Sequence, residues 1–499
     1  MLFDYLIIGN SVLGLTTAYR LAQLEPNAKI GIVGPSARTG GATVAAGAML
    51  GVFGEMTAAV YADEYEKAYF GLAHQAQTMW PDFVTELNDQ LDPMDHVQIH
   101  PNGTFILLNT HGTSQDDTPN YEAILHALKE YNEPHTEVAP RDIPGLCPEE
   151  RSRSLSGVYI PNERSINPMA VLHALERVLQ QKQFVTQIDA TVSTLLMAAQ
   201  NAHRIRGVAL DNGDVHEASQ VIIAAGAGSQ DLVDSLPALN GRIPHIMSGD
   251  GVSFVFDQTL LGEHQIEHVI RTPNRAGACG LHVVPNVKNK SHLYLGAGNM
   301  MQWRPVQGAS MESATWIMKS SLKEINKHLG DARLLKFNQG NRPTPIDGYP
   351  LFGATTSVEG LWFLTGTGRD GFQRAPLLSW HIAKKLTGAT TLSEIEKNTL
   401  EIFDLFAPER LPLQTDTQEE AIQHLKKEVY CALHETDGLL TTGLHASFPD
   451  WLNRDIRDIY AQLDTDLALP PMAVLPIVCR RWPVDMVKGY LDAAKQAWA

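Results

Sequence analysis

The sequence predicts an α/β fold that begins with a Rossmann-type dinucleotide-binding unit and carries a second, sheet-based unit inserted in the first. Apolar periodicity at the N-terminus indicates a strand at 4–8, a helix at 12–24 and a second strand at 29–33. A fully apolar run at 221–229 ends in glycines, which is typical of a buried parallel strand. From 242 to 298 the pattern changes to short β runs, which indicates the inserted unit.

The turn between the first strand and the helix is Gly9-Asn10-Ser11-Val12-Leu13-Gly14, one glycine short of the dinucleotide-binding GxGxxG pattern. Gly9 lets the chain turn, the small Ser11 lets the backbone approach a pyrophosphate, and Gly14 lets the helix pack closely on the strand. The helix N-terminus offers N–H donors to the anion. The turn therefore predicts diphosphate binding, with an ordinary βα turn as the alternative.

The end of the second strand lacks the acidic residue that binds a ribose hydroxyl in dinucleotide-binding folds. Gly34, Pro35 and Ser36 stand there instead. A backbone carbonyl or Ser36 is left to hold the ribose, and we expect the adenosine end of the ligand to be bound less tightly than usual.

The length and the net charge of the chain limit the number of structural units and the kinds of partner that we expect. The 499 residues predict two or three structural units, and the formal charge of −17 argues against nucleic acid or an anionic membrane as partner. The first strand begins close to Met1, which leaves no room for a signal peptide, and we expect a cytoplasmic protein. The small apolar stretch 44–60 contains Glu55 and is short for a membrane span, so we expect buried loop and helix there.

The cysteines predict no metal site and no disulfide framework. They lie far apart in the chain and form no CxxC pair: Cys147, Cys279, Cys431 and Cys479.

The remaining elements follow from periodicity and from turn residues. Glycines at 40–51 allow backbone to lie flat against a large ligand, with a flexible loop as the alternative. Helices are expected at 58–91, 121–128, 167–179 and 376–386. Strands are expected at 104–108, 158–161, 190–195, 206–210, 251–256, 280–284, 292–295 and 361–364, and irregular segments at 140–148 and 338–350.

Three apolar stripes near the C-terminus predict a helical extension over 413–499, with helices at 419–433, 451–463 and 484–498. We expect these stripes to pack on the rest of the chain. A subunit interface or a partner-docking module is the alternative, and a homo-oligomer is possible on that interpretation.

Five motifs together carry a family resemblance. GNSVLG, ATVAAGAMLG, VIIAAGAGS, GNRPTPIDGYPLFG and GTGRDGFQRAP occur in the order seen in FAD-dependent oxidoreductases of the D-amino-acid oxidase type. The chain resembles this family over about residues 1–412, with glycine oxidase and sarcosine oxidase as the nearest branch. The resemblance implies a discontinuous FAD-binding domain (1–85, 150–240 and 335–400) and an antiparallel-sheet substrate domain (86–149 and 241–334) that roofs the flavin.

The resemblance also implies which residues hold the cofactor. Cys279 is not in the context of the motif that attaches FAD in sarcosine oxidases, so we expect non-covalent FAD. Val12 and Leu13 would lie at the pyrophosphate, in the cofactor-binding turn that also contains Gly9, Ser11 and Gly14, with the ribose near Gly34 and Pro35 and the adenine at Val192. The isoalloxazine would lie along Ala42, Thr43, Gly47, Ala48 and Met49, approached by Gly226 and covered at its pyrimidine edge by Thr367, Gly368, Arg369, Asp370, Gly371, Phe372 and Gln373.

Three residues are expected to meet the substrate. Arg342 resembles the family's arginine that clamps a carboxylate, and a guanidinium offers the two parallel donors that a carboxylate needs; an exposed loop arginine is the alternative. Arg369 matches a second position that meets substrate. His282 falls where relatives tend to place a tyrosine over the substrate, although a lone histidine in a β run is as often a core residue.

These residues predict an FAD-dependent oxidase of an amino acid or secondary amine. Hydride would pass from the α carbon to the flavin N5, the imine would hydrolyse, and dioxygen would reoxidise the flavin to give hydrogen peroxide. One alternative is a dehydrogenase that passes electrons to a quinone or a protein. Another is a flavin-holding module that binds a partner and has weak activity.

Overall fold

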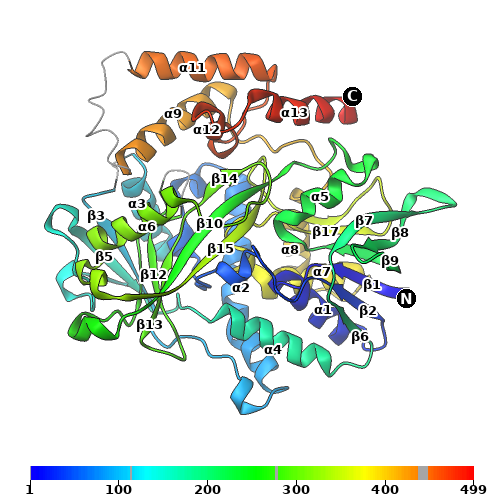
Figure 1. The fold of residues 1–499 in the computed structure, drawn as a ribbon, viewed down its shortest axis with the longest axis horizontal. Coiled ribbons are helices and arrows are strands. Elements are labelled where there is room, and N and C mark those ends of the chain that lie inside the picture. Colours follow the sequence, from blue (N-terminus) through cyan, green and yellow to red (C-terminus); the bar gives the residue numbers. More distant parts are fainter. Residues whose placement is uncertain (1, 113–114, 276–278, 436–447) are drawn as a thin grey trace.

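The computed structural model describes residues 2–112, 115–275, 279–435 and 448–499. Figure 1 shows two sheets side by side, helices packed on the first sheet, and a helical layer from the C-terminal segment over one end of the molecule. This arrangement confirms the predicted α/β fold with an inserted sheet and a helical extension.

The first sheet has a parallel centre, as the N-terminal pattern predicted. β1 (Leu2–Ile8) pairs with β2 (Ile30–Val33) on one side and β9 (Val215–Ile223) on the other, and both pairings are parallel. The full order is β16-β17-β9-β1-β2-β6, with β16 (Leu351–Ala354), β17 (Leu361–Thr365) and β6 (Val185–Ile188). β7 (Val192–Ala198) and β8 (Asn201–Leu210) extend β9 as an antiparallel ribbon.

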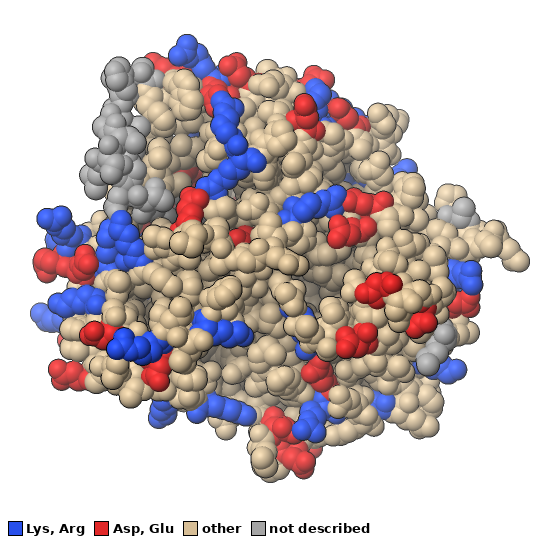
Figure 2. All heavy atoms as spheres, in the orientation of Figure 1, with Lys and Arg blue, Asp and Glu red and all other residues tan. Residues whose placement is uncertain are grey.

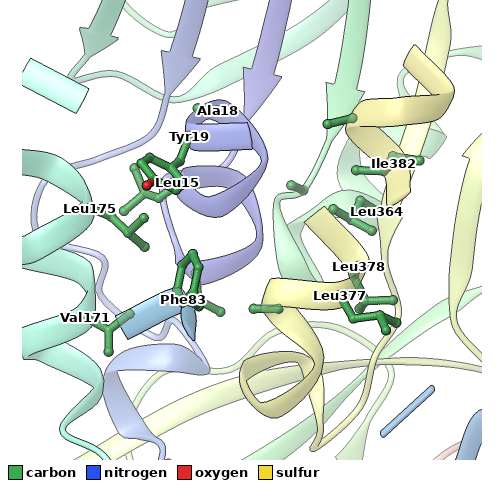
Figure 3. Packing of buried hydrophobic residues seen from close by; sticks show 14 of the residues in the cluster. Leu15, Ala18, Tyr19, Phe83, Val171, Leu175, Leu364, Leu377, Leu378 and Ile382 are labelled. Carbon is green, nitrogen blue, oxygen red and sulfur yellow. The ribbon is translucent and has the colours of Figure 1, made fainter. Parts of the chain in front are cut away.

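Alternate residues of these strands enter two different cores, because side chains of a strand point to opposite faces. Ile7 and Ile32 face the helices, whereas Leu6 and Ile8 face the ribbon and α5 (Ser229–Asp234). The helical face is covered by α1 (Val12–Leu24), α2 (Glu64–Asn88), α4 (Pro168–Gln180) and α7 (Gly371–Leu386). Figure 3 shows this packing, with Leu15 and Tyr19 of α1 close to Leu175 of α4. The Tyr19 ring meets the Phe83 ring of α2 edge to face.

The second sheet has the order β14-β10-β13-β12-β11-β3-β5-β4, and β15 pairs with β10. Its pairings are antiparallel except for the parallel pair β3–β11. Its strands are β3 (Thr104–Asn109), β4 (Thr136–Val138), β5 (Ser154–Ile160), β10 (Ile246–Asp257), β11 (Val269–Arg271), β12 (His282–Pro285), β13 (His292–Gly296), β14 (Met300–Gln302) and β15 (Arg333–Pro345).

β15 corrects the prediction of an irregular segment at 338–350. The strand pairs with β10 along its length, from Ile246↔Pro345 to Asp257↔Arg333. Within the described residues β15 has β10 as its one strand neighbour, and an edge position tolerates Pro343 and Pro345, which have no N–H to donate. β5 and β15 also belong to the second sheet, whereas the predicted boundaries at 150 and 335 placed their residues in the first unit.

Helix boundaries differ from prediction where a local cap decides them. The helix expected from residue 58 begins at Glu64, because the Asp63 carboxylate accepts hydrogen bonds from the N–H groups of Tyr65 and Glu66; residues 58–61 form a 3₁₀ turn. The stretch 44–60 contains short 3₁₀ turns in place of the expected helix. α7 begins five residues before Pro376. α3 (Asp117–Glu130) is longer than the helix expected at 121–128, and the structure adds α6 (Met311–Glu324) and α8 (Glu394–Leu405), which were not predicted.

The C-terminal extension packs on the body, as expected. It comprises α9 (Gln418–Glu435), α11 (Phe448–Leu463), α12 (Pro471–Val478, which was not predicted) and α13 (Val484–Trp498). Their apolar faces share one core with Met247, Met301 and Ile346 of the body.

The described helices, and the described residues on the face drawn in Figure 2, show no feature typical of a membrane span or of a nucleic-acid-binding surface. None of the helices described is both long enough and apolar enough to span a bilayer. Figure 2 shows one face, where the described Lys and Arg residues are interspersed with Asp and Glu and form no extended basic surface of the kind that nucleic acid requires.

Candidate active site

A cavity of about 650 Å³ lies where the two sheets meet. It is lined by the N-terminus of α1, the segment after β2, the start of β7, the turn after β9, the sheet residues of β10, β12, β13 and β15, and the turn before α7. A volume of this size suits a large ligand, and contributions from both sheets are typical of a cofactor meeting a substrate.

The two outer glycines of the N-terminal turn have the roles predicted from the sequence. A Cβ on Gly9 would lie 2.2 Å from the Ala224 carbonyl oxygen, and one on Gly14 would lie 1.8 Å from the Gly9 carbonyl oxygen. Gly14 does not line the cavity but allows α1 to pack on β1. Ser11 makes no side-chain cap bond, and the first turn of α1 has no acidic residue. Val12 and Leu13 of this turn line the cavity, so the N–H groups at the start of α1 are available to bind an anion.

Asn10 occupies the place where an acidic side chain at residue 34 would stand. Its Nδ2 donates to the carbonyl oxygens of Gly34 and Pro35, both at 3.0 Å, and a Cβ on Gly34 would lie 2.5 Å from the Asn10 side chain. Arg38 also lines the cavity, where its Nε donates to the Asn10 carbonyl oxygen at 2.9 Å and its guanidinium pairs with Glu176. Ser36 does not line the cavity, so the predicted use of its side chain for the ribose finds no support.

The cavity fits a bound dinucleotide. Gly226 and Gly228 line it after β9, and a Cβ on either would meet no atom within 4 Å, so a side chain there would project into the open space. Gly226 also has φ +59°, which favours glycine. Together with the donors of α1, these positions form a cradle for backbone contact with an extended ligand.

Arg342 lies on β15 and lines the cavity. In the part of the chain that the structure describes, the hydrogen-bond partners of its guanidinium are neutral: Nη1 donates to the Gly298 carbonyl oxygen at 2.5 Å and to Asn299 Oδ1 at 3.2 Å. The Asp250 carboxyl of β10 interacts with it through charge. The guanidinium lies over Gly251 of β10, where a Cβ would be 2.7 Å from the Arg342 Cζ. A cation with neutral hydrogen-bond partners beside a cavity is suited to bind a carboxylate.

Glu55 and Arg369 also line the cavity, and Arg271 pairs with Glu55 outside the lining. Arg271 Nη1 lies 2.5 Å from Glu55 Oε1, and Arg369 Nη2 lies 3.8 Å from Glu55 Oε2. Although burial opposes ionisation, the guanidinium groups of Arg271 and Arg369 hold the pKa of the Glu55 carboxyl well below its usual value. Glu55 is therefore an anion at neutral pH, and Arg369 is held at the cavity by Glu55 and by Asn274 Oδ1 at 3.1 Å.

His282 and Tyr294 form the roof. Their rings stack with centroids 5.8 Å apart, His282 Nδ1 lies 2.9 Å from the Gly280 carbonyl oxygen, and the Tyr294 hydroxyl donates to the Ala45 carbonyl oxygen at 3.0 Å. Burial, with the nearby Arg271 charge, lowers the pKa of His282 to about 4, so its imidazole is neutral at neutral pH.

The structure brings the sequence-predicted residues together. Arg342, Arg369 and His282 all line the cavity, as do the predicted cofactor residues other than Gly14: Gly9, Ser11, Val12, Leu13, Gly34, Pro35, Ala42, Thr43, Gly47, Ala48, Met49, Val192, Gly226, Thr367, Gly368, Asp370, Gly371, Phe372 and Gln373. The Phe372 ring, however, stacks on Trp80, and Gln373 Nε2 donates to the Ala73 carbonyl oxygen, so these two side chains bind α2.

Sequence reasoning missed Asn10, Arg38, Glu55 and Tyr294 as cavity residues. A sequence feature could have identified two of them: Asn10 lies inside the glycine motif itself, and Glu55 is the one charged residue in the apolar stretch 44–60. The other two gave none, because their approach to the cavity depends on contacts between distant segments.

The profile of one protein family, DAO, described as "FAD dependent oxidoreductase", matches residues 4–385, which is more than half of the chain. The chain belongs to this family. Its cofactor is therefore FAD, and the predicted resemblance is confirmed.

Curated relatives of this DAO-family chain include two glycine oxidases. The protein from Pseudomonas putida is 26% identical over 395 residues and that from Pseudomonas aeruginosa is 23% identical over 385 residues; each alignment covers 77% of this chain and 94% of the relative. Among solved structures, glycine oxidase from Geobacillus kaustophilus aligns with a TM-score of 0.66 and 18% identity, covering 82% of this chain and 99% of that one. The chain is thus an FAD-dependent oxidoreductase with the fold of glycine oxidase.

Proposed function

We propose that this DAO-family enzyme oxidises the carbon–nitrogen bond of an amino acid or of a secondary amine that bears a carboxylate. The product imine would hydrolyse to a 2-oxo acid and an amine, with dioxygen as the electron acceptor and hydrogen peroxide as its product. Bound FAD supplies the acceptor for a hydride from the substrate α carbon. The protein supplies binding, orientation and a dry environment.

The observation that supports the proposal is the Arg342 guanidinium, a cation at the cavity whose hydrogen-bond partners are neutral. Nη1 is held by the Gly298 carbonyl and the Asn299 side chain, which leaves other guanidinium donors for a carboxylate. Two parallel N–H donors match the two carboxylate oxygens and fix the direction of the substrate as well as its position.

The other wall residues orient the rest of the substrate. The neutral His282 ring and the Tyr294 ring cover the site and exclude water, and neither adds a positive charge that would compete with Arg342 for the carboxylate. The Glu55 anion also lines the cavity, where Arg271 and Arg369 balance its charge.

Relatives support the same substrate class. The curated proteins that match most of this chain carry the name glycine oxidase. The chain covers 94% of each, so the comparison extends over nearly the whole of those enzymes.

The test is anaerobic addition of amines to the purified holoprotein. A panel of amino acids and N-alkyl amino acids should include one that bleaches the flavin absorbance, and the bleached enzyme should release a 2-oxo acid. Admission of air should then restore the colour with peroxide formation. Bleaching without peroxide in air would favour a dehydrogenase with a quinone or protein acceptor, and no bleaching by any carboxylated amine would contradict the proposal.

A further inference from the structure

The C-terminal extension lies beyond the residues that match the DAO family, which end at 385. It packs on one end of the second sheet, where α12 contacts β14, and Figure 1 shows α12 above β14. The core that it shares with the body contains Met247 of β10, Met301 of β14 and Ile346, which directly follows β15. The extension therefore touches the three strands around Arg342.

β14 is a short strand at the edge of the second sheet, and the C-terminal extension covers it. It pairs with β10 through Gly249↔Met301 and one residue pair on either side. The same Gly249 pairs with Arg342 on the opposite side of β10, so Met301, Gly249 and Arg342 form one row across the sheet. Met301 is 7% exposed because the extension covers it.

The Arg342 side chain crosses β10 along this row. Its guanidinium reaches Gly298 and Asn299, which directly precede β14. The crossing depends on two glycines, because a Cβ on Gly251 would lie 2.7 Å from the Arg342 Cζ and one on Gly249 would lie 2.4 Å from Asn299 Oδ1. The segment that leads into β14 therefore holds the guanidinium, and the Gly298 N–H donates to the Val252 carbonyl oxygen of β10 at 3.2 Å.

A chain of aromatic contacts links β14 to the extension. Trp303 directly follows β14, stacks on His245 at 3.7 Å between ring centroids, and meets Trp482 edge to face at 5.5 Å. Trp482 lies between α12 and α13 and is 7% exposed. Trp303 is thus joined through the three residues of β14 to Asn299 and Gly298, the acceptors of Arg342.

We infer that the C-terminal extension positions the substrate-binding Arg342, acting through Trp482, Trp303 and β14. The inference rests on the proposed function of Arg342. Trp482 is in these terms a positioning residue, and it touches neither substrate nor cofactor. The extension would give this enzyme a support for its substrate arginine that the family core does not itself contain.

The experiment compares Trp482→Ala with Trp451→Ala, a matched control because Trp451 is a tryptophan of the same extension that is 46% exposed. Removal of a buried aromatic contact should raise the KM of the carboxylated amine that bleaches the flavin by about three- to tenfold. The kcat, the Kd for FAD and the KM of an amine without a carboxylate should stay close to wild type. Trp482→Phe should restore the KM, and Trp451→Ala should change none of these values.

A double-variant cycle separates positioning from general loosening. In an Arg342→Ala background, Trp482→Ala should give no further rise in KM, because its effect passes through Arg342. An equal rise in both backgrounds, equal rises for both amines, or no rise at all would overturn the inference. If Trp482→Ala does not give folded holoprotein, Met301→Ala makes the same test from β14. An Arg342→Ala effect that ignores the carboxylate would overturn the proposed function too, whereas a selective Arg342→Ala effect with a silent Trp482→Ala overturns this inference alone.

Discussion

Among single residues, Glu163 shows how burial and hydrogen bonding compete for a carboxyl group. It is 1% exposed and accepts hydrogen bonds from the N–H groups of Val52, Phe53 and Gly54, just before Glu55. Burial raises the pKa of Glu163 to about 7 even though these N–H groups and Arg271 act in the opposite direction. The carboxyl that holds the segment before Glu55 therefore changes its charge near neutral pH.

We predict that Glu163 makes the folded state less stable as pH rises. The folded chain keeps this proton up to about pH 7, whereas an unfolded carboxyl loses it near the ordinary value of 4.5. Between these values the folded state binds more protons than the unfolded state, so the free energy of unfolding falls as pH increases, by on the order of 3 kcal/mol at most. Glu163→Gln cannot ionise and should lose this component.

Thermal melts of the holoprotein between about pH 5 and about pH 8 make the measurement. The Tm difference between Glu163→Gln and wild type should shift in favour of the variant as pH rises. Glu263→Gln is the control, because the Glu263 side chain is 89% exposed. A Tm difference that is the same at every pH would show that Glu163 keeps an ordinary pKa.

At the scale of elements, the extension covers apolar surface that the body cannot cover alone. Its helices bury Met247, Met301 and Ile346 in a shared core. Truncation after residue 412 would expose these side chains, and we predict insoluble or flavin-poor protein. The soluble fraction and the visible flavin absorbance give the readout.

Co-expression of residues 413–499 as a separate chain is the control for that truncation. It should restore soluble, yellow protein if loss of the shared core is the cause. A truncated chain that is soluble and binds FAD as tightly as the full chain would show that the extension is an independent module.

The elements that sequence reasoning predicted are those whose pattern is local. β1, α1 and β2 follow from an apolar run, a glycine turn and helical spacing within a few dozen residues. β15 could not be predicted in this way, because its polar residues become a strand only by pairing with β10, some ninety residues earlier in the chain. α12 was hidden by its two prolines, Pro471 at the first turn and Pro476 inside the helix.

The residues of the candidate site likewise fall into those that the sequence predicted and those that depend on contacts between distant segments. The family resemblance predicted that Arg342, Arg369 and His282 meet the substrate, and all three line the cavity. The acceptors of Arg342, Gly298 and Asn299, lie across β10 and are fixed by the register of three strands, which no local pattern contains.

For the whole molecule, FAD should be bound without a covalent link. Cys279 is the cavity-lining cysteine of the described residues, and Arg369 and His282 line the same cavity. We predict that acid or heat releases intact FAD into the supernatant, and that Cys279→Ser retains the cofactor. Flavin that stays with the denatured chain, and is lost in Cys279→Ser, would contradict this prediction.

The proposed activity depends on recognition of a substrate carboxylate by Arg342, and one comparison tests that recognition most directly. The KM of wild type, Arg342→Lys and Arg342→Ala is measured for two amines that differ only in the presence of the carboxylate, with the Kd for FAD alongside. A charge-assisted bidentate pair contributes about 1.5 to 3 kcal/mol, so Arg342→Ala should raise the KM of the carboxylated amine by at least roughly tenfold and leave FAD binding intact. Arg342→Lys should recover part of the loss, since lysine cannot present two parallel donors. Equal effects on both amines, or none on either, would show that Arg342 is structural and would contradict the assignment of an amino-acid substrate.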